Sequence, residues 1–281
     1  MNDTTPQLSA IATFRELHSS GCFVLPNPWD VGTAVVLQRL GFSALATTSA
    51  GFAFTRGLPD DVSAIPCDVM LGHIRDIVTA TPLPVNADFQ NGYADEPESI
   101  AANVALCVAT GVAGLSIEDA TGDSTAPLYE QDLAVERIRA ARAAIDATGI
   151  PVLLTARCEA WLVGHPSPFQ VAVERLVAFA EAGADCLYAP GVREPEEIAE
   201  IVNAVSPKPV NVLMSAPSPV LSVARLADLG VRRISLGSAL ARAAWGALIR
   251  AARGMTTAGS FDGLAGAASF AELNTIFQNR G

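Results

Sequence analysis

The feature that most constrains the fold is a sequence pattern that occurs four times along the chain. In each copy a helix-like segment ends at a glycine, and an apolar strand-like run begins within a residue or two. The glycines are Gly41, Gly111, Gly183 and Gly230. Glycine here favours the left-handed backbone that ends a helix and turns the chain into the next strand. The pattern therefore predicts a chain in which helices and strands alternate.

Four more apolar runs complete a set of eight predicted strands, at residues 22–27, 83–89, 151–157 and 208–214. The runs are nearly continuous in apolar residues, which is typical of parallel strands buried on both faces, and a helical stretch can be placed after each. Eight such units favour one closed (β/α)8 barrel of the TIM type, which needs roughly 250 residues, and the chain has 281. No Gly-x-Gly-x-x-Gly follows the first predicted strand, which argues against an open dinucleotide-binding sheet.

We assign residues 1–255 to the barrel, with a leading helix within residues 1–20. Residues 256–281 form a second segment, in which small residues make a linker and residues 269–278 have the pattern of a short helix. Two placements are open for that helix: against its own barrel or against a neighbouring subunit.

Composition excludes several classes of function. The chain has 18 Lys and Arg against 29 Asp and Glu, and no basic stripe suited to nucleic acid. No apolar run approaches the roughly 18 residues that cross a bilayer, and the polar N-terminus lacks the layout of a signal peptide. The five cysteines are scattered and odd in number, as expected of free thiols in a reducing compartment. We expect a cytoplasmic protein that binds neither nucleic acid nor membrane.

Charged side chains end three successive predicted strands, the third, fourth and fifth. They are Asp88, Glu118 and Arg157, and in a barrel of this kind the active site lies at the C-terminal ends of the strands. Carboxylates hold Mg²⁺ or Mn²⁺, and an arginine can clamp a carboxylate with two hydrogen bonds. Ser49 and the backbone N–H groups near Gly51 are suited to an anionic end of the ligand. These residues together predict a site for a metal ion and a small anionic carboxylate.

Each residue alone has a simpler structural interpretation. A lone acid at a strand end more often caps a helix or forms an ion pair, and we expect this of Asp30 and Asp119. Arg157 could pair with Glu159 or Asp119, and Asn211 could bond only to backbone at the barrel rim. Convergence on neighbouring strands is what favours the functional interpretation.

The three histidines, His18, His73 and His165, do not have the spacing of a metal motif or a catalytic triad. His18 and His73 lie on predicted helices, where we interpret them as surface or packing residues. No Gly-x-Ser-x-Gly and no P-loop is present, so neither a triad hydrolase nor a nucleotide phosphotransferase is supported.

Taken together, these motifs resemble the isocitrate lyase/phosphoenolpyruvate mutase superfamily over roughly residues 10–255. The likeness is greatest to the branch described as phosphonomutase-like or methylisocitrate-lyase-like. It implies a Mg²⁺-dependent (β/α)8 enzyme that acts on a small α-keto or α-hydroxy acid through an enolate-like state. The segments that carry the resemblance are NPWDVGTA, TTSAG, GLPD, DFQNGYADEP, SIEDATGD, LLTARCEAWL, PVNVL and VRRISLGSAL.

The resemblance also implies roles for individual residues. Asp88 matches a direct metal ligand, and Glu118 matches an acid that holds a metal-bound water. Gln90 occupies a position where a second acid is usual, and its amide would hold the metal through water. Asp60 and Arg157 are assigned to catalysis, and Arg157 also to clamping the substrate.

On the same grounds, Ser49, Ala50 and Gly51 match the segment that grips the substrate's anionic end, and we place Asn211 among the substrate-binding residues. The resemblance further implies a homotetramer, a dimer of dimers, in which the helix at residues 269–277 is exchanged between partners.

Departures from the family pattern narrow the expected substrate. Lyases of isocitrate and methylisocitrate carry Lys-Lys-Cys-Gly-His after the fourth strand, whereas residues 120–126 contain neither Cys nor His. The mutase's lid lysine and asparagine are also missing, and Gly191 stands where lyases of large triacids use glutamate. We therefore expect a lyase that breaks a C–C bond of an oxaloacetate-like acid, with residues 121–129 as a lid that is ordered only with ligand.

Two alternatives remain open: a mutase or hydrolase of a phosphonopyruvate-type C–P bond, and a catalytically silent keto-acid-binding protein.

Overall fold

The computed structural model describes residues 4–278. Residues 1–3 of the expected segment 1–255 and residues 279–281 of the expected segment 256–281 lie outside it. Its eight strands form one parallel sheet in the order β1-β8-β7-β6-β5-β4-β3-β2. Between β1 and β2 the backbone N–H of Ala46 donates to the carbonyl of Pro26 at 3.0 Å, so the barrel is nearly closed. The predicted (β/α)8 barrel is confirmed. The strands are β1 Phe23–Leu25, β2 Leu45–Ala46, β3 Val85–Asp88, β4 Gly114–Glu118, β5 Leu153–Arg157, β6 Cys186–Tyr188, β7 Val210–Leu213 and β8 Arg233–Ser235.

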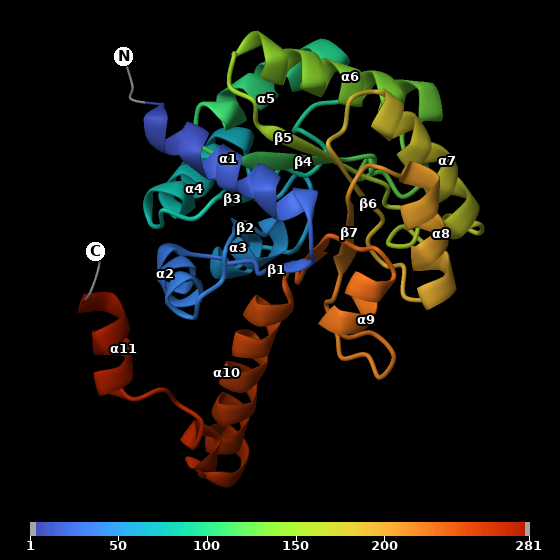
Figure 1. Ribbon diagram of the computed structural model, residues 1–281. Helices are drawn as coiled ribbons and strands as arrows, with labels where there is room; N and C mark the ends of the chain where they lie inside the picture. Colours follow the sequence, from blue (N-terminus) through green and yellow to red (C-terminus); the bar gives the residue numbers. More distant parts are fainter. Residues whose placement is uncertain (1–3, 279–281) are drawn as a thin grey trace.

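Helices surround the barrel (Figure 1), and α1 precedes the first strand. The four glycines of the repeated pattern all have left-handed φ values, from 86° at Gly230 to 106° at Gly183. Each lies between a helix and the next strand, as predicted. The helices are α1 Thr5–Ser19, α2 Val31–Arg39, α3 Ser49–Thr55, α4 Cys67–Thr79, α5 Pro97–Val108, α6 Gln131–Ala147, α7 Pro168–Glu181, α8 Pro195–Val205, α9 Val223–Asp228, α10 Ala239–Ala258, the 3₁₀ helix η1 Asp262–Leu264 and α11 Phe270–Gln278.

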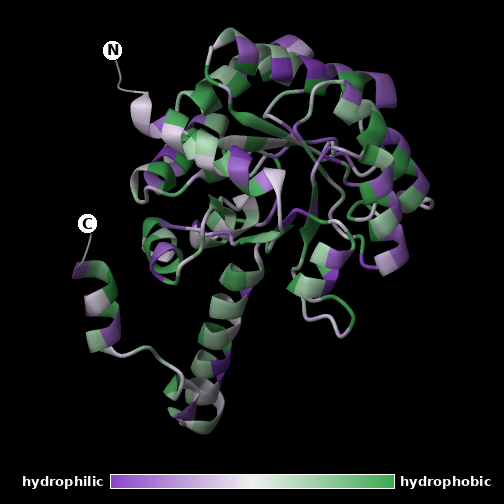
Figure 2. Cartoon of the chain, in the orientation of Figure 1, coloured by the Kyte–Doolittle hydropathy of each residue, from purple (hydrophilic) through white to green (hydrophobic). Residues whose placement is uncertain are grey.

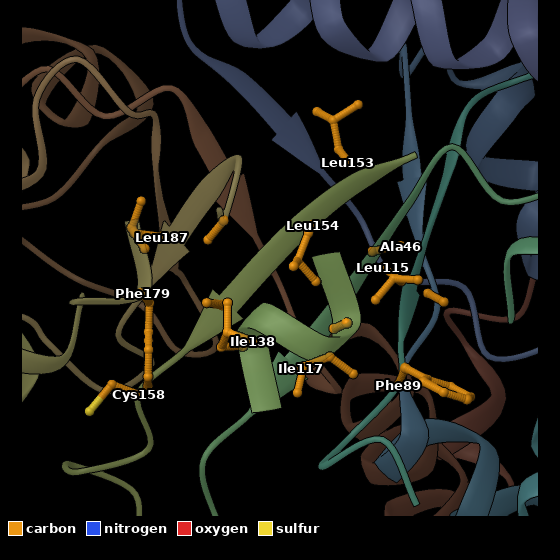
Figure 3. Close-up of a cluster of buried hydrophobic side chains, with 14 of the residues drawn as sticks. Ala46, Phe89, Leu115, Ile117, Ile138, Leu153, Leu154, Cys158, Phe179 and Leu187 are labelled. Atoms are coloured by element: carbon orange, nitrogen blue, oxygen red, sulfur yellow. The ribbon is translucent and has the colours of Figure 1, made fainter. Parts of the chain in front are cut away.

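The main core lies between the strands and the surrounding helices, and the strands are largely hydrophobic (Figure 2). Figure 3 shows Leu115 and Ile117 of β4 near Leu154 of β5 and Ile138 of α6, all of them buried. Because side chains alternate along a strand, the residue between Leu115 and Ile117, Ser116, faces the barrel interior, where it lines a cavity. The strands thus present apolar side chains to the helices and polar ones to the interior.

Helix α10 extends away from the barrel (Figure 1). It ends at Ala258, three residues beyond the expected segment boundary at 255, and the next residue, Gly259, has a φ of 63°. Trp245 on this helix is 38% exposed. The following helix, α11, contacts α2 of the same chain. Its exchange between subunits stays a prediction.

Among the residues described, no helix has the length and apolar character needed to cross a membrane.

Candidate active site

A cavity of about 160 Å³ lies at the C-terminal ends of the strands. Three predicted site residues, Gly51, Gln90 and Glu118, are buried outside its lining. The others line it: Ser49, Ala50, Asp60, Asp88, Arg157 and Asn211. The fold therefore brings the charged ends of β3 and β5 to one small pocket together with the loop that carries Asp60.

Arg157 is the centre of the charge network. Its Nη1 donates to Asp88 Oδ1 at 2.7 Å and lies 3.0 Å from Glu118 Oε2, and its Nε donates to Glu159 Oε1 at 2.9 Å. The guanidinium carbon lies 5.2 Å from the centre of the Tyr188 ring. Three carboxyl groups thus share one cation.

Burial shifts the proton equilibria of this cluster. It raises the pKa of Glu118 to about 8 and that of Glu159 to about 7, and in both cases Arg157 opposes the shift. Burial, followed by the charge of Asp88, also raises the pKa of Asp60. For Arg157 burial alone would lower the pKa, but its acidic neighbours hold it well above its usual value. The cluster would therefore be stabilised by an additional positive charge.

Asp88 is fixed through both of its oxygens. Oδ1 accepts from Arg157, and Oδ2 accepts from the backbone N–H and the hydroxyl of Ser49, both at 2.9 Å. Ser49 begins helix α3, whose N-cap, Thr48, accepts from the Gly51 N–H at 3.1 Å. A side chain at Gly51 would come within 2.6 Å of Thr48 Cγ2 and 3.0 Å of Trp29 Cβ, so close packing requires glycine there.

The residues present fit a hydrated Mg²⁺ site. No three His, Cys, Asp or Glu side chains between residues 4 and 278 are arranged to hold a metal directly. Mg²⁺, however, is commonly held by one or two carboxylates and keeps several waters. Asp88 and Glu118 supply carboxylates, and the buried side-chain oxygen of Gln90 has no hydrogen-bond partner. That oxygen is an acceptor that a water or a cation would satisfy.

The loop after β3 is held by an arginine that sequence reasoning missed. Arg137 of α6 is 1% exposed and donates to the carbonyls of Asn91, Ala94 and Asp95. Its guanidinium lies 3.7 Å from the Tyr129 ring centre. Arg137 follows the buried Ala134 and Val135 and precedes Ile138, so its place on an apolar helix face was the available signal.

Two acids have the structural roles predicted for them. Asp30 caps α2 by accepting from the Thr33 N–H at 2.7 Å. Asp119 accepts from Arg175 at 2.9 Å and from the Glu159 N–H at 2.8 Å.

The alternative that Asn211 bonds only to backbone is wrong, because its amide contacts the side chains of Arg233 and Ser235. Arg233 was missed, and it too lines the cavity.

The expected lid, residues 121–129, is a loop whose two ends are bonded to each other. Ala120 and Leu128 make an antiparallel bridge, and the Thr121 N–H donates to the Pro127 carbonyl at 3.1 Å. A side chain at Gly122 would lie 2.5 Å from Val62, so the loop touches the segment that carries Asp60. Its ordering by ligand stays a prediction.

The family model, one relative of known name and two solved structures to which the chain is similar all agree with one another. Residues 14–256 match the family model described as phosphoenolpyruvate phosphomutase. The 2-methylisocitrate lyase of Escherichia coli is 31% identical over 208 residues, which are 67% of this chain and 68% of that one. A crystal structure from Burkholderia cenocepacia, named as a candidate lyase/mutase, has a TM-score of 0.92 and 48% identity, covering 97% of this chain and 96% of that one. An oxaloacetate acetylhydrolase bound to its product oxalate has a TM-score of 0.83 and 26% identity, covering 96% and 94%.

Proposed function

The chain belongs to the phosphoenolpyruvate phosphomutase family, and from this premise we propose that it is a Mg²⁺-dependent lyase that breaks a C–C bond of a small keto or hydroxy diacid. An oxaloacetate-like acid fits best. The observation that carries the proposal is the convergence of Asp60, Asp88 and Arg157 on one cavity of about 160 Å³. Relatives whose names specify cleavage of methylisocitrate and oxaloacetate support the reaction class.

The size of the cavity favours a small substrate. Pockets for drug-sized ligands enclose about 300–1,000 Å³, whereas this cavity encloses about 160 Å³. After β6, a side chain at Gly191 would come within 2.6 Å of Trp161 Cβ, so this position has no room for the glutamate that lyases of large triacids use. A four-carbon diacid suits these dimensions better than a branched triacid.

Arg157 would bind and orient the substrate carboxylate. Its Nη1 and Nε are engaged by carboxylates, whereas its Nη2 makes no hydrogen bond to any residue between 4 and 278. The Nη2 hydrogens are therefore available to a ligand carboxylate in the cavity. Ser49 would hold Asp88 in place through its two hydrogen bonds.

Asp88, Glu118 and the amide oxygen of Gln90 would hold the metal. When bound, Mg²⁺ supplies a positive charge against the negative charge that develops on the substrate oxygen during bond cleavage. One fewer acid at Gln90 should weaken Mg²⁺ affinity relative to a site with an Asp-x-Asp pair.

A proton-NMR turnover screen tests the proposal. The protein would be incubated with Mg²⁺, with and without chelator, on oxaloacetate, methylisocitrate, 2,3-dimethylmalate, phosphonopyruvate and phosphoenolpyruvate. We expect chelator-sensitive loss of a C4 diacid. Turnover of phosphonopyruvate alone would instead identify a C–P enzyme, and keto-acid binding without turnover would identify a silent binder.

Replacing one carboxylate tests the assignment of the metal site. We expect Asp88→Asn to lower kcat by about 100-fold or more, because the variant loses a charged ligand, and to weaken Mg²⁺ binding measured by calorimetry. Asp61→Asn is the matched control, because Asp61 is an exposed acid outside the cavity lining. Equal Mg²⁺ affinity in the two variants would contradict the assignment.

A further inference from the structure

Arg233 is a buried cation without an acidic partner. It lies on β8, faces the barrel interior and is 2% exposed. Its neighbours within hydrogen-bond distance are neutral: Asn211 Oδ1 at 2.9 Å, Thr155 Oγ1 at 3.1 Å and His18 Nε2 at 3.4 Å. Within residues 4–278, no carboxylate lies within ion-pair distance of its guanidinium. Burying an unpaired charge is costly, and this layer of a barrel is usually filled by branched apolar residues.

A guanidinium can only donate hydrogen bonds, so Arg233 fixes the orientation of its neighbours. The Asn211 side-chain oxygen must face it, and the Asn211 amino group must therefore face away. That group donates to Ser235 Oγ at 2.9 Å. His18 is held in the tautomer that carries its hydrogen on Nδ1, because Nδ1 lies 2.7 Å from the Phe14 carbonyl, which can only accept a hydrogen bond. Its Nε2 is therefore left to accept from Arg233.

The donor-to-acceptor order of these hydrogen bonds continues from Ser235 towards the cavity. The Ser235 oxygen accepts from Asn211, so its own hydrogen is free to donate, and the Tyr188 hydroxyl lies 3.5 Å away at the edge of hydrogen-bond distance. Tyr188 donates no hydrogen bond to a residue in the described part of the chain, and both Tyr188 and Ser235 line the cavity. A hydrogen-bond chain that begins at a group that only donates thus ends in one free donor, the Tyr188 hydroxyl.

The opposite wall of the cavity has the reverse polarity. Asp60 and Asp88 line that side and, when ionised, can only accept hydrogen bonds. The cavity is therefore divided between an acidic side on β3 and the loop of Asp60, and a side on β6 where the Tyr188 hydroxyl is a donor. A ligand with two anionic groups could place one near Arg157 and the other against Tyr188.

We propose that Arg233 is a positioning residue that, through Asn211 and Ser235, leaves the Tyr188 hydroxyl as a hydrogen-bond donor, and that this hydroxyl binds the second anionic group of a diacid. The inference rests on the proposed function in taking the ligand to be a small diacid. It adds which residues recognise the second carboxylate of that ligand.

The test compares two probes that differ by one carboxylate. Malate and 2-hydroxybutyrate share a hydroxy acid and a four-carbon chain, but only malate has a second carboxylate. Calorimetry in Mg²⁺ would measure the dissociation constant of each. We expect the wild-type protein to prefer malate and Tyr188→Phe to weaken malate binding about tenfold, as for the loss of one hydrogen bond to a charged group. Binding of 2-hydroxybutyrate should change less than twofold.

Asn211→Asp reverses the hydrogen-bond chain with little change in shape. The new carboxylate cannot donate, so Ser235 must turn its hydrogen towards it, and the Ser235 oxygen can then accept from Tyr188. We expect the same loss of malate affinity as in Tyr188→Phe. The double variant should lose little more than either single one, because all three lack the same donor.

Variants of Arg233 separate positioning from packing. Arg233→Lys keeps a donor-only cation and should retain the preference for malate, whereas Arg233→Met should lose it. If Arg233→Met does not fold, as judged by circular dichroism, Tyr188→Phe and Asn211→Asp still decide. The inference is wrong if the wild type binds both probes equally, or if these two variants keep the wild-type preference.

Failure of the inference and failure of the proposed function give different results. Turnover without a malate preference would leave the lyase standing and remove the subsite. A malate preference that depends on Tyr188, without turnover of any substrate in the panel, would leave the subsite standing and remove the lyase.

Discussion

At the scale of single residues, Arg157 joins stability to ligand binding. Its guanidinium is shared by Asp88, Glu118 and Glu159, all largely buried. Replacing it by alanine leaves these carboxylates without their cation in a site where burial already opposes ionisation. The substitution should therefore affect more than substrate affinity.

We expect Arg157→Ala to lower the free energy of unfolding by about 3–5 kcal/mol, the usual cost of breaking a buried ion pair from one side. Keto-acid binding should be lost as well. Denaturant unfolding at neutral pH measures the first effect, and Arg157→Lys, which keeps the charge, is the matched control. An unfolding free energy equal to that of the wild type in Arg157→Ala would show that the network does not stabilise the fold.

His18 is another residue whose surroundings set its chemistry. Of the two interpretations offered for it, surface or packing, packing is confirmed, since it is 8% exposed. Burial, and next the charge of Arg233, lowers its pKa to about 3. The unfolded chain therefore binds this proton at a higher pH than the folded one, so the contribution of His18 to stability falls as the pH drops from about 6.5 towards 3.

For this residue we expect about 2 kcal/mol less stability at pH 5 than at pH 8. The raised pKa values of Glu118 and Glu159 act in the opposite sense, because their ionisation opposes folding as the pH rises. The measurement is therefore the difference in pH dependence between wild type and His18→Gln, by chemical denaturation. His165→Gln, which removes a partly exposed imidazole, is the matched control. An unchanged slope in His18→Gln would refute the expectation.

At the scale of elements, the order of strands and helices could be predicted because its signals are local. A glycine that ends a helix, such as Gly111, and an apolar run after it are decided within about ten residues of sequence. Which side chains face the interior of the barrel depends instead on contacts between residues far apart in the sequence. Arg232 and Arg233 are adjacent and chemically alike, but Arg232, just before β8, donates to the Gly21 carbonyl at 3.1 Å, whereas Arg233 is buried inside the barrel. Only closure of the sheet determines that Arg233 is the one inside.

The same distinction applies to the site. Asp88 and Arg157 could be predicted because both end strands, and strand ends converge in any such barrel. Arg137 holds the loop from Asn91 to Asp95 from a helix more than 40 residues away in sequence. That contact depends on how α6 packs against the loop, which no local pattern reports.

We expect Arg137→Met to loosen this loop. The variant removes hydrogen bonds to three carbonyls, so amide exchange within residues 91–95 should become about tenfold faster or more. Arg139→Met is the matched control, since Arg139 is exposed on the same helix. Hydrogen exchange followed by mass spectrometry compares the two. Equal protection of residues 91–95 in both variants would show that Arg137 does not hold the loop.

At the scale of the whole molecule, α10 presents apolar side chains to solvent in a single chain. Trp245, Leu248 and Ile249 are 38%, 56% and 44% exposed, although the sequence pattern of a barrel helix would bury such residues. An uncovered apolar patch of this kind commonly marks a contact surface. We propose that a second copy of the chain covers it within the expected tetramer.

Light scattering coupled to size-exclusion chromatography measures the assembly directly. We expect a mass of four chains of 29.1 kDa for the wild type, and dissociation on Leu248→Glu, because a charge would be buried at the contact. Arg253→Glu lies on the same helix and also adds negative charge, so it is the control that should keep the wild-type mass. A monomeric wild-type protein would exclude the assembly.

The contact between α1 and β8 has a consequence for how the chain is made. His18 reaches Arg233 across 215 residues of sequence, so α1 leaves the ribosome long before its partner strand exists. At typical rates of synthesis that interval lasts roughly 10–40 s. Throughout it Ile11 and Phe14, both buried in the finished barrel, have no completed surface against which to pack. The first helix to be synthesised thus obtains its last partner strand only near the end of synthesis, and until then we expect its apolar face to be open to molecular chaperones.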